Sequence, residues 1–69
     1  MPTEHLKSIT IHKTMHIVLG SRIKTKTGRI AWVVEDIYRF NRGVIWVLLR
    51  NDRGQARTIK AEQIGVLLP

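Results

Sequence analysis

The sequence predicts a single, small, all-β domain built as an antiparallel barrel, and three observations lead to that prediction. The chain has only 69 residues, below the usual size of one domain, so its core is small. Its five glycines fall at fairly even intervals and read as turns. The runs between them are rich in Ile, Val, Thr, Trp and Tyr, whose branched or aromatic side chains favour strands. Short strands joined by tight turns close into a barrel that leaves few unpaired edges.

The first strands of this barrel are expected after residue 20. In residues 22–26 strict alternation puts Ile23 on one face and three cations on the other, the period of a half-buried strand. Thr27-Gly28 then predicts a turn, and residues 30–38 a second strand. Glu35-Asp36 interrupts its alternation, so a bulge is expected there.

The remaining elements alternate between turn and strand. In order they are a turn at 41–43, a strand at 44–50, a hairpin turn at 51–54, a strand at 55–60, one short helical turn at 61–64 and a last strand at 66–68. In the first of these turns Gly43, and also Asn41, can take a positive φ. Residues 19–69 are therefore assigned to the barrel. Residues 1–18 are assigned to an N-terminal extension, partly disordered or forming an extra strand at 8–12, with its first residues frayed.

The expected core consists of one apolar face of each strand, and its members are Ile23, Val33, Ile37, Ile45, Val47, Leu49, Ile59 and Ile64. Trp46 and Trp32 then face outward, together with aliphatic neighbours. An apolar stripe of that width usually marks an interface. Cover by Ile9 and Ile11 of the N-terminal segment, or a homo-oligomer face, is favoured over a base-stacking platform. A homodimer is the default symmetry.

The charge balance points to polyanionic partners. Twelve Lys and Arg stand against five Asp and Glu, a formal net charge of +7, and nucleic acid leads the candidates. An acidic protein partner, or a merely solvated basic surface, stays open. No signal peptide is recognised and no apolar run is long enough to cross a bilayer, so a cytoplasmic location without membrane association is expected.

The best candidate site is the basic face of residues 22–26 together with the turn that follows, because cations in a row can neutralise successive phosphates. Arginines at the turns flanking the third strand suit phosphate as well, since the guanidinium donates two parallel hydrogen bonds. The candidate nucleic-acid contacts, DNA or RNA, are Arg22, Lys24, Lys26, Arg29, Arg39, Arg42, Arg50, Arg53, Arg57 and Lys60. Trp32 and Trp46 are the candidate stacking or oligomer face.

No residue pattern predicts catalysis, a metal or a cofactor. His12 and His16 lie four residues apart, a spacing that shares a metal only in a helix, and the β-branched residues around them oppose one. Adjacent Glu35 and Asp36 do not form an acid/base pair on a strand. There is no Cys, and no serine lies in a nucleophile motif.

The sequence also resembles SH3-like barrels, including the KOW and Tudor-type modules. Leu19-Gly20-Ser21-Arg22-Ile23-Lys24 is similar to the start of their first strand, and residues 59–64 to their strand, short helical turn and final strand. From Gly20 onward the layout resembles the C-terminal DNA-binding domain of retroviral integrases, which implies about five strands and DNA binding.

The layout is similar as well to the plasmid-type dihydrofolate reductase, a tetramer around one pore. That family lines its pore with Val-Gln-Ile-Tyr, where this chain has Arg57-Thr58-Ile59-Lys60 and keeps only the Ile, while Lys24 or Lys26 matches a pore lysine. The sequence therefore predicts a non-catalytic nucleic-acid-binding module that contacts mainly phosphates. The alternatives are a protein-docking adaptor and, less favoured, a pore-forming reductase.

Overall fold

A computed structural model describes residues 3–69, which form an all-β fold of antiparallel strands, as predicted. The strands are β1 (Thr3–His5), β2 (Ser8–Ile11), β3 (Met15–Val18), β4 (Arg22–Thr25), β5 (Ala31–Phe40), β6 (Ile45–Arg50), β7 (Ala56–Lys60) and β8 (Ile64–Leu67). The short helical turn expected before the last strand is confirmed as a 3-10 turn, η1 (Ala61–Gln63). It is the only helical element among residues 3–69.

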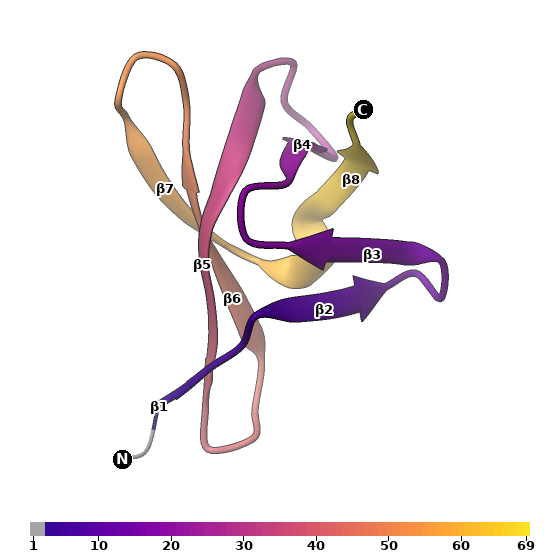
Figure 1. The fold of residues 1–69 in the computed structure, drawn as a ribbon, viewed down its shortest axis with the longest axis vertical. Coiled ribbons are helices and arrows are strands. Elements are labelled where there is room, and N and C mark those ends of the chain that lie inside the picture. The colour runs from indigo at the N-terminus through magenta and orange to yellow at the C-terminus, as the bar shows by residue number, and fades with distance from the viewer. Residues whose placement is uncertain (1–2) are drawn as a thin grey trace.

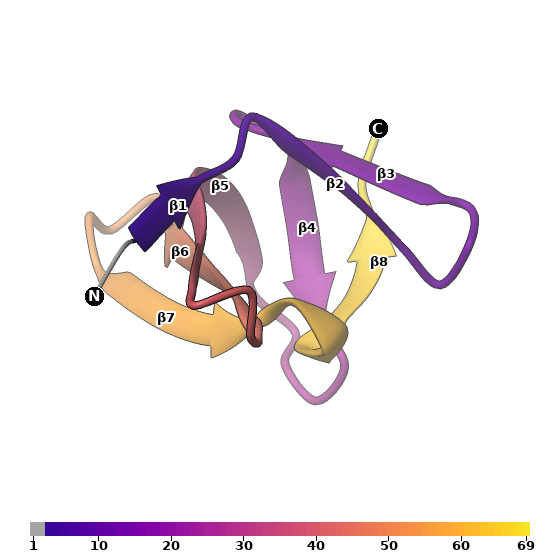
Figure 2. The same ribbon diagram turned by 90° about the horizontal axis from the view of Figure 1, so that it is seen from below.

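Six of the strands form one sheet and two form a hairpin. The sheet runs in the order β7-β6-β5-β4-β8, with β1 added along β5, and β2 pairs with β3 alone. Figures 1 and 2 show the hairpin crossing one side of the sheet, with the core between them. No strand pairing joins β7 to β8 in the part of the chain that the structure describes. A closed barrel therefore stays a prediction.

The bulge predicted in the second barrel strand is confirmed. In β5 the register with β6 shifts between Val34 and Asp36, so one extra residue is inserted at Glu35. Such an insertion bends the strand and strengthens its twist. The first part of β5 accordingly pairs with β4, and its last part pairs with β1 at Tyr38, Arg39 and Phe40.

The bulge also explains an error in the predicted core. Val33 was expected inside and is 41% exposed, whereas Trp32 and Val34, expected outside, are buried at 7% and 1%. Strict alternation would put Val33 on the same face as Ile37. The extra residue at the bulge shifts the alternation by one, so Trp32 and Val34 face the core in place of Val33. The other expected core residues are buried, except that Ile45 is half-buried against the core.

The N-terminal hairpin supplies part of that core. Ile9 of β2 and Ile17 of β3 belong to the same buried cluster as Trp32 and Val34, so N-terminal residues do cover apolar strand residues there. His12 at the hairpin tip has its Nε2 3.2 Å from the carbonyl oxygen of Ile64, which ties the tip to the start of β8. The expectation that the first residues are frayed is wrong for Thr3–His5, because they form β1 and pair with β5, and residues 1 and 2 lie outside the described residues.

The turn between β5 and β6 differs from its predicted conformation. Asn41 and Arg42 have φ of 50° and 58°, whereas Gly43 is not among the residues with positive φ. The amide of Gly43 donates to the carbonyl of Phe40 at 2.8 Å, which closes a two-residue turn. A type I′ turn needs positive φ at both central residues, and its twist matches that of the strands. Asn41 and Arg42, the two central residues of the turn, therefore both take the left-handed conformation.

Candidate nucleic-acid interface

The outer face of the main sheet, away from the hairpin, carries two rows of side chains that the strand register defines. The basic row runs through Arg22 on β4, Val33 on β5 and Arg50 on β6. The aromatic row runs through His5 on β1, Tyr38 on β5, Trp46 on β6 and Lys60 on β7. The bulge at Glu35 and Asp36 lies between the two rows.

Strand β4 places the predicted basic face as expected. Ile23 and Thr25 are buried while Arg22 is exposed and Lys24 half-buried, so the two cations point away from the core. Lys26 is exposed beyond the end of β4. Among residues 3–69, Arg22, Lys24 and Lys26 form no ion pair with a carboxylate. Three cations therefore lie in succession with their charges available.

The turn that continues this basic face is held by a side-chain hydrogen bond. The amide of Gly28 donates to Thr25 Oγ1 at 3.0 Å, and the amide of Lys26 donates to the carbonyl of Gln63 at 2.9 Å. A Cβ added at Gly28 would lie 2.6 Å from Thr25 Oγ1, so any other residue there would displace the hydroxyl that holds the turn. Arg29 stands exposed on this constrained turn.

Arg50, predicted as a phosphate contact, forms hydrogen bonds with other residues of the chain while its side chain stays 44% exposed. Its Nε donates to Glu35 Oε2 at 2.5 Å, its Nη2 to Glu35 Oε1 at 3.2 Å and its Nη1 to the carbonyl of Gly54 at 2.7 Å. The hydrogen bond from Arg50 holds the pKa of the Glu35 carboxyl below its ordinary value, and Glu35 in turn raises the pKa of Arg50. This guanidinium therefore links the bulge to the β6–β7 turn.

Arg39 is paired in a similar way, since its Nε donates to Glu4 Oε1 at 2.5 Å and joins β5 to β1. At the bulge, His5 Nδ1 lies 3.2 Å from Asp36 Oδ1. Three of the carboxylates thus have basic partners within the described chain. Two of the predicted contacts, Arg39 and Arg50, are already engaged.

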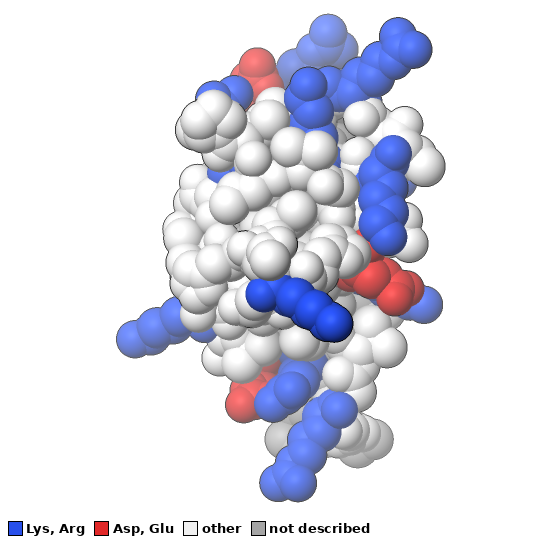
Figure 3. Space-filling model, turned by 90° about the vertical axis from the view of Figure 1, so that its right-hand side faces the viewer, with Lys and Arg blue, Asp and Glu red and all other residues white. Residues whose placement is uncertain are grey.

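The other predicted cations are spread over both ends of the sheet. Arg53 is exposed in the β6–β7 turn and lines a shallow hollow with Ile30 from the β4–β5 turn, at the end where Arg29 lies. Arg42 and Lys60 lie at the opposite end, and Arg57 is exposed on the edge strand β7. Figure 3, which views the hairpin side, shows Lys and Arg standing out at the upper and lower ends of the molecule.

Sequence reasoning missed the residue that builds the turn beneath Arg53. Asn51 is buried, and its Oδ1 accepts from the amides of Arg53 and Gln55, each at 3.0 Å. Its Nδ2 donates to Gln55 Oε1 at 2.9 Å. An Asn at the start of a predicted turn is the signal that points to such an arrangement.

The aromatic row was missed for the most part as well. Of the two tryptophans predicted as a stacking or oligomer face, Trp46 is half-buried on the outer face but Trp32 is buried, so the prediction for Trp32 is wrong. In its place the structure brings Tyr38, Phe40 and His5 to the side of Trp46. The apolar residues at every second position after the bulge, Tyr38 and Phe40, are the signal that predicts this cluster.

Nothing in residues 3–69 gathers three or more His, Asp or Glu side chains where they could hold a metal ion. His16 Nδ1 lies 3.3 Å from Thr10 Oγ1 across the hairpin. Ile59, the residue shared with the reductase pore segment, is buried, while Thr58 and Lys60 are exposed. Within the described range no helix has the length and apolar character needed to span a membrane.

Comparisons with protein families, with curated proteins and with solved structures found no match to this chain.

Proposed function

We propose that this protein is a non-catalytic nucleic-acid-binding module that contacts mainly phosphates. The observation that supports this most is the outward placement of Arg22 and Lys24 on β4, followed by Lys26 and Arg29, with no carboxylate partner in residues 3–69. A row of unpaired cations neutralises successive phosphates and releases the counterions condensed on them. The net charge of +7 adds long-range attraction.

The fold proposed for residues 19–69 is an SH3-like barrel of about five strands. Two features support it: β8 lies beside β4 in the sheet, and η1 connects β7 to β8. In such a barrel the basic strand β4 lies between two neighbours and presents only one face to a partner. That restriction favours contacts along a backbone rather than insertion into a groove.

Sequence preference is expected to be weak. Phosphate contacts fix the position of a protein on nucleic acid but carry no sequence information. Base reading in the major groove usually needs a helix or a two-stranded ribbon with Asn, Gln or Arg aimed at base edges. The cations of the β4 face stand instead on the broad face of a sheet.

The test compares two double variants that remove equal charge. Arg22→Gln with Lys24→Gln removes both charges from the outer face of β4 and keeps polar side chains there. Lys7→Gln with Lys13→Asn removes two exposed cations from the N-terminal segment, and Asn suits Lys13 because its φ is 66°. Binding to duplex DNA is measured by fluorescence anisotropy over a range of salt concentrations.

The β4 variant should bind more weakly, with a log–log salt slope flatter by about two units, since each lost phosphate contact removes roughly 0.9. The control variant should change the slope by less than half as much. Equal slopes for the parent and the β4 variant would reject the β4 face as the site and favour docking to an acidic protein.

A further inference from the structure

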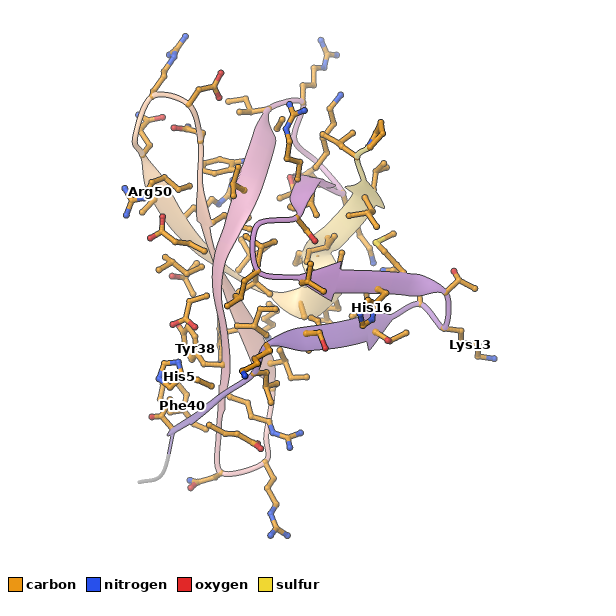
Figure 4. The ribbon with its side chains drawn as sticks, viewed as in Figure 1. His5, Lys13, His16, Tyr38, Phe40 and Arg50 are labelled. Atoms are coloured by element: carbon orange, nitrogen blue, oxygen red, sulfur yellow. The ribbon has the colours of Figure 1, made fainter. Side chains whose placement is uncertain are left out.

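Aromatic side chains from distant parts of the chain meet on the outer face of the sheet. Register sets His5, Tyr38 and Trp46 opposite one another on the neighbouring strands β1, β5 and β6. Phe40 lies two residues from Tyr38 on the same face, with 5.5 Å between ring centres, and the ring of His5 is 6.2 Å from that of Tyr38. Figure 4 shows these three rings together on the side of β5 that faces away from the hairpin.

These rings are accessible. Phe40 is 47% exposed, and the side chain of His5 is 66% exposed. Tyr38 and Trp46 are half-buried. The core uses the other face of the same strands through Ile37 and Val47, so the aromatic residues are not needed to fill it. Every base has a flat face that stacks on an aromatic ring, and rings on neighbouring strands of a sheet can each hold one base.

The charges beside the rings suit a nucleic-acid strand. Lys60 belongs to the same register row, and its Nζ lies 6.0 Å from the centre of the Trp46 ring, the outer limit of a cation–π contact. A base that stacks on Trp46 can displace this ammonium toward a phosphate. Arg42 is exposed in the turn that follows Phe40, and like Lys60 it forms no ion pair in residues 3–69.

Two carboxylates near the row, Asp36 and Glu4, have basic partners. Asp36 faces His5, and Glu4 accepts from Arg39. Repulsion between these two groups and a phosphate is therefore reduced, whereas Glu62, which lines a hollow with Lys60, has no ion pair in residues 3–69.

Building on the proposed function, we infer that His5, Tyr38, Phe40 and Trp46 form a platform for unpaired bases, so that the partner is single-stranded nucleic acid. Bases within a duplex are stacked on one another and cannot reach the rings, whereas those of a single strand can. The basic face of β4 then adds phosphate contacts without regard to sequence.

The test uses two oligomers with equal charge. One is an oligothymidine of about ten nucleotides and the other an abasic oligomer of the same length, which keeps the phosphates and lacks the bases. The protein should bind the oligothymidine roughly tenfold or more tightly than the abasic oligomer at the same salt concentration. It should also bind the oligothymidine more tightly than a duplex of equal length.

Variants locate the effect. Tyr38→Leu with Phe40→Leu keeps apolar side chains but removes two rings, and should reduce the preference for oligothymidine without changing affinity for the abasic oligomer. Phe40→Leu alone, at an exposed position, carries the test if the double variant does not fold. Val66→Ala, which trims another exposed apolar residue away from the row, is the control and should leave the preference intact.

Failure of this inference is distinct from failure of the proposed function. Equal affinity for the oligothymidine and the abasic oligomer would overturn the platform, leave phosphate binding in place and point to a protein as the partner of the rings. A preference that survives loss of the rings, or tighter binding to duplex, would also overturn it. No binding to any of the three would reject the proposed function itself.

Discussion

Arg42 combines an unfavourable backbone conformation with an exposed charge beside the aromatic row. Its φ of 58° is a left-handed conformation that costs a non-glycine residue about 1–2 kcal/mol. Asn-Gly is the pair preferred in such turns. Arg42 therefore lowers stability at a place where a cation would assist binding.

Arg42→Gly should raise the free energy of unfolding by about 0.5–1 kcal/mol, because glycine loses extra chain entropy but relieves the strain. For a domain of this size that corresponds to a Tm increase of about 2–8 °C. The same variant should flatten the salt slope with single strands by about 0.7. The control is Arg53→Gly, which removes the same charge at a position without positive φ and should not raise the Tm. A lower Tm for Arg42→Gly than for the parent would show that the backbone of Arg42 is not strained.

The Glu35–Arg50 pair should make stability depend on pH in acid. Because Arg50 lowers the pKa of Glu35 in the folded protein, the stabilisation is present above the unfolded pKa of about 4.3 and is lost as the pH falls through the lower, folded pKa. The effect is small, since the pair is exposed to solvent.

Thermal unfolding from about pH 5 down to pH 3 tests this. The Tm of the parent should fall more steeply than that of Glu35→Gln, which has no carboxyl to protonate at that position. Glu62→Gln, at an exposed glutamate without an ion pair in residues 3–69, should follow the parent. Parallel curves for the parent and Glu35→Gln would show that the pair adds nothing.

At the scale of elements, the N-terminal hairpin should be integral to the fold. Ile17 of β3 has no exposed surface, whereas its neighbour Val18 is 40% exposed. Ile17→Ala should cost about 2–5 kcal/mol, a large share of the stability of so small a domain, and Val18→Ala should change stability by less than about 0.5 kcal/mol. Chemical denaturation of both variants checks this, and equally small losses would mean that the sheet is stable without its hairpin.

The strands β4 to β7 could be predicted to within one or two residues, because alternation and turn residues are local signals. Strand β1 could not, since it has three residues and pairs with the far end of β5, a contact that leaves no local pattern. The prediction of which β5 residues before the bulge face the core was wrong. The extra residue at the bulge shifts the alternation by one, so Val33 lies outside.

The candidate site was predictable only in part, for a related reason. Composition and alternation identify the cations of β4, but they do not show which arginines are engaged. Arg39 and Glu4 are 35 residues apart, and Arg50 and Glu35 are 15 apart. Such pairs depend on strand register, as does the meeting of His5 with Tyr38.

For the molecule as a whole, self-association stays a prediction, now without Trp32. The outer face offers exposed apolar side chains at Val33, Phe40 and Val44, and Trp46 in the aromatic row is half-buried. A dimer through this face would compete with bases for the same rings. If the protein forms a dimer through this face, light scattering should show that added oligothymidine converts it to a complex of one 8.0 kDa chain with one bound strand. A dimer that persists when oligothymidine is bound would place the contact between the two copies on another surface.

Binding of nucleic acid to the outer face of the sheet can be followed directly through the two tryptophans. Trp46 lies on that face, whereas Trp32 is 7% exposed and lies in the core. The measurement is the NMR spectrum of the ¹⁵N-labelled protein during titration with oligothymidine. Binding at this face should shift the indole signal of Trp46 and the amide signals of β4, while the indole signal of Trp32 stays in place. Shifts confined to the β2–β3 hairpin, or no shifts at all, would contradict it.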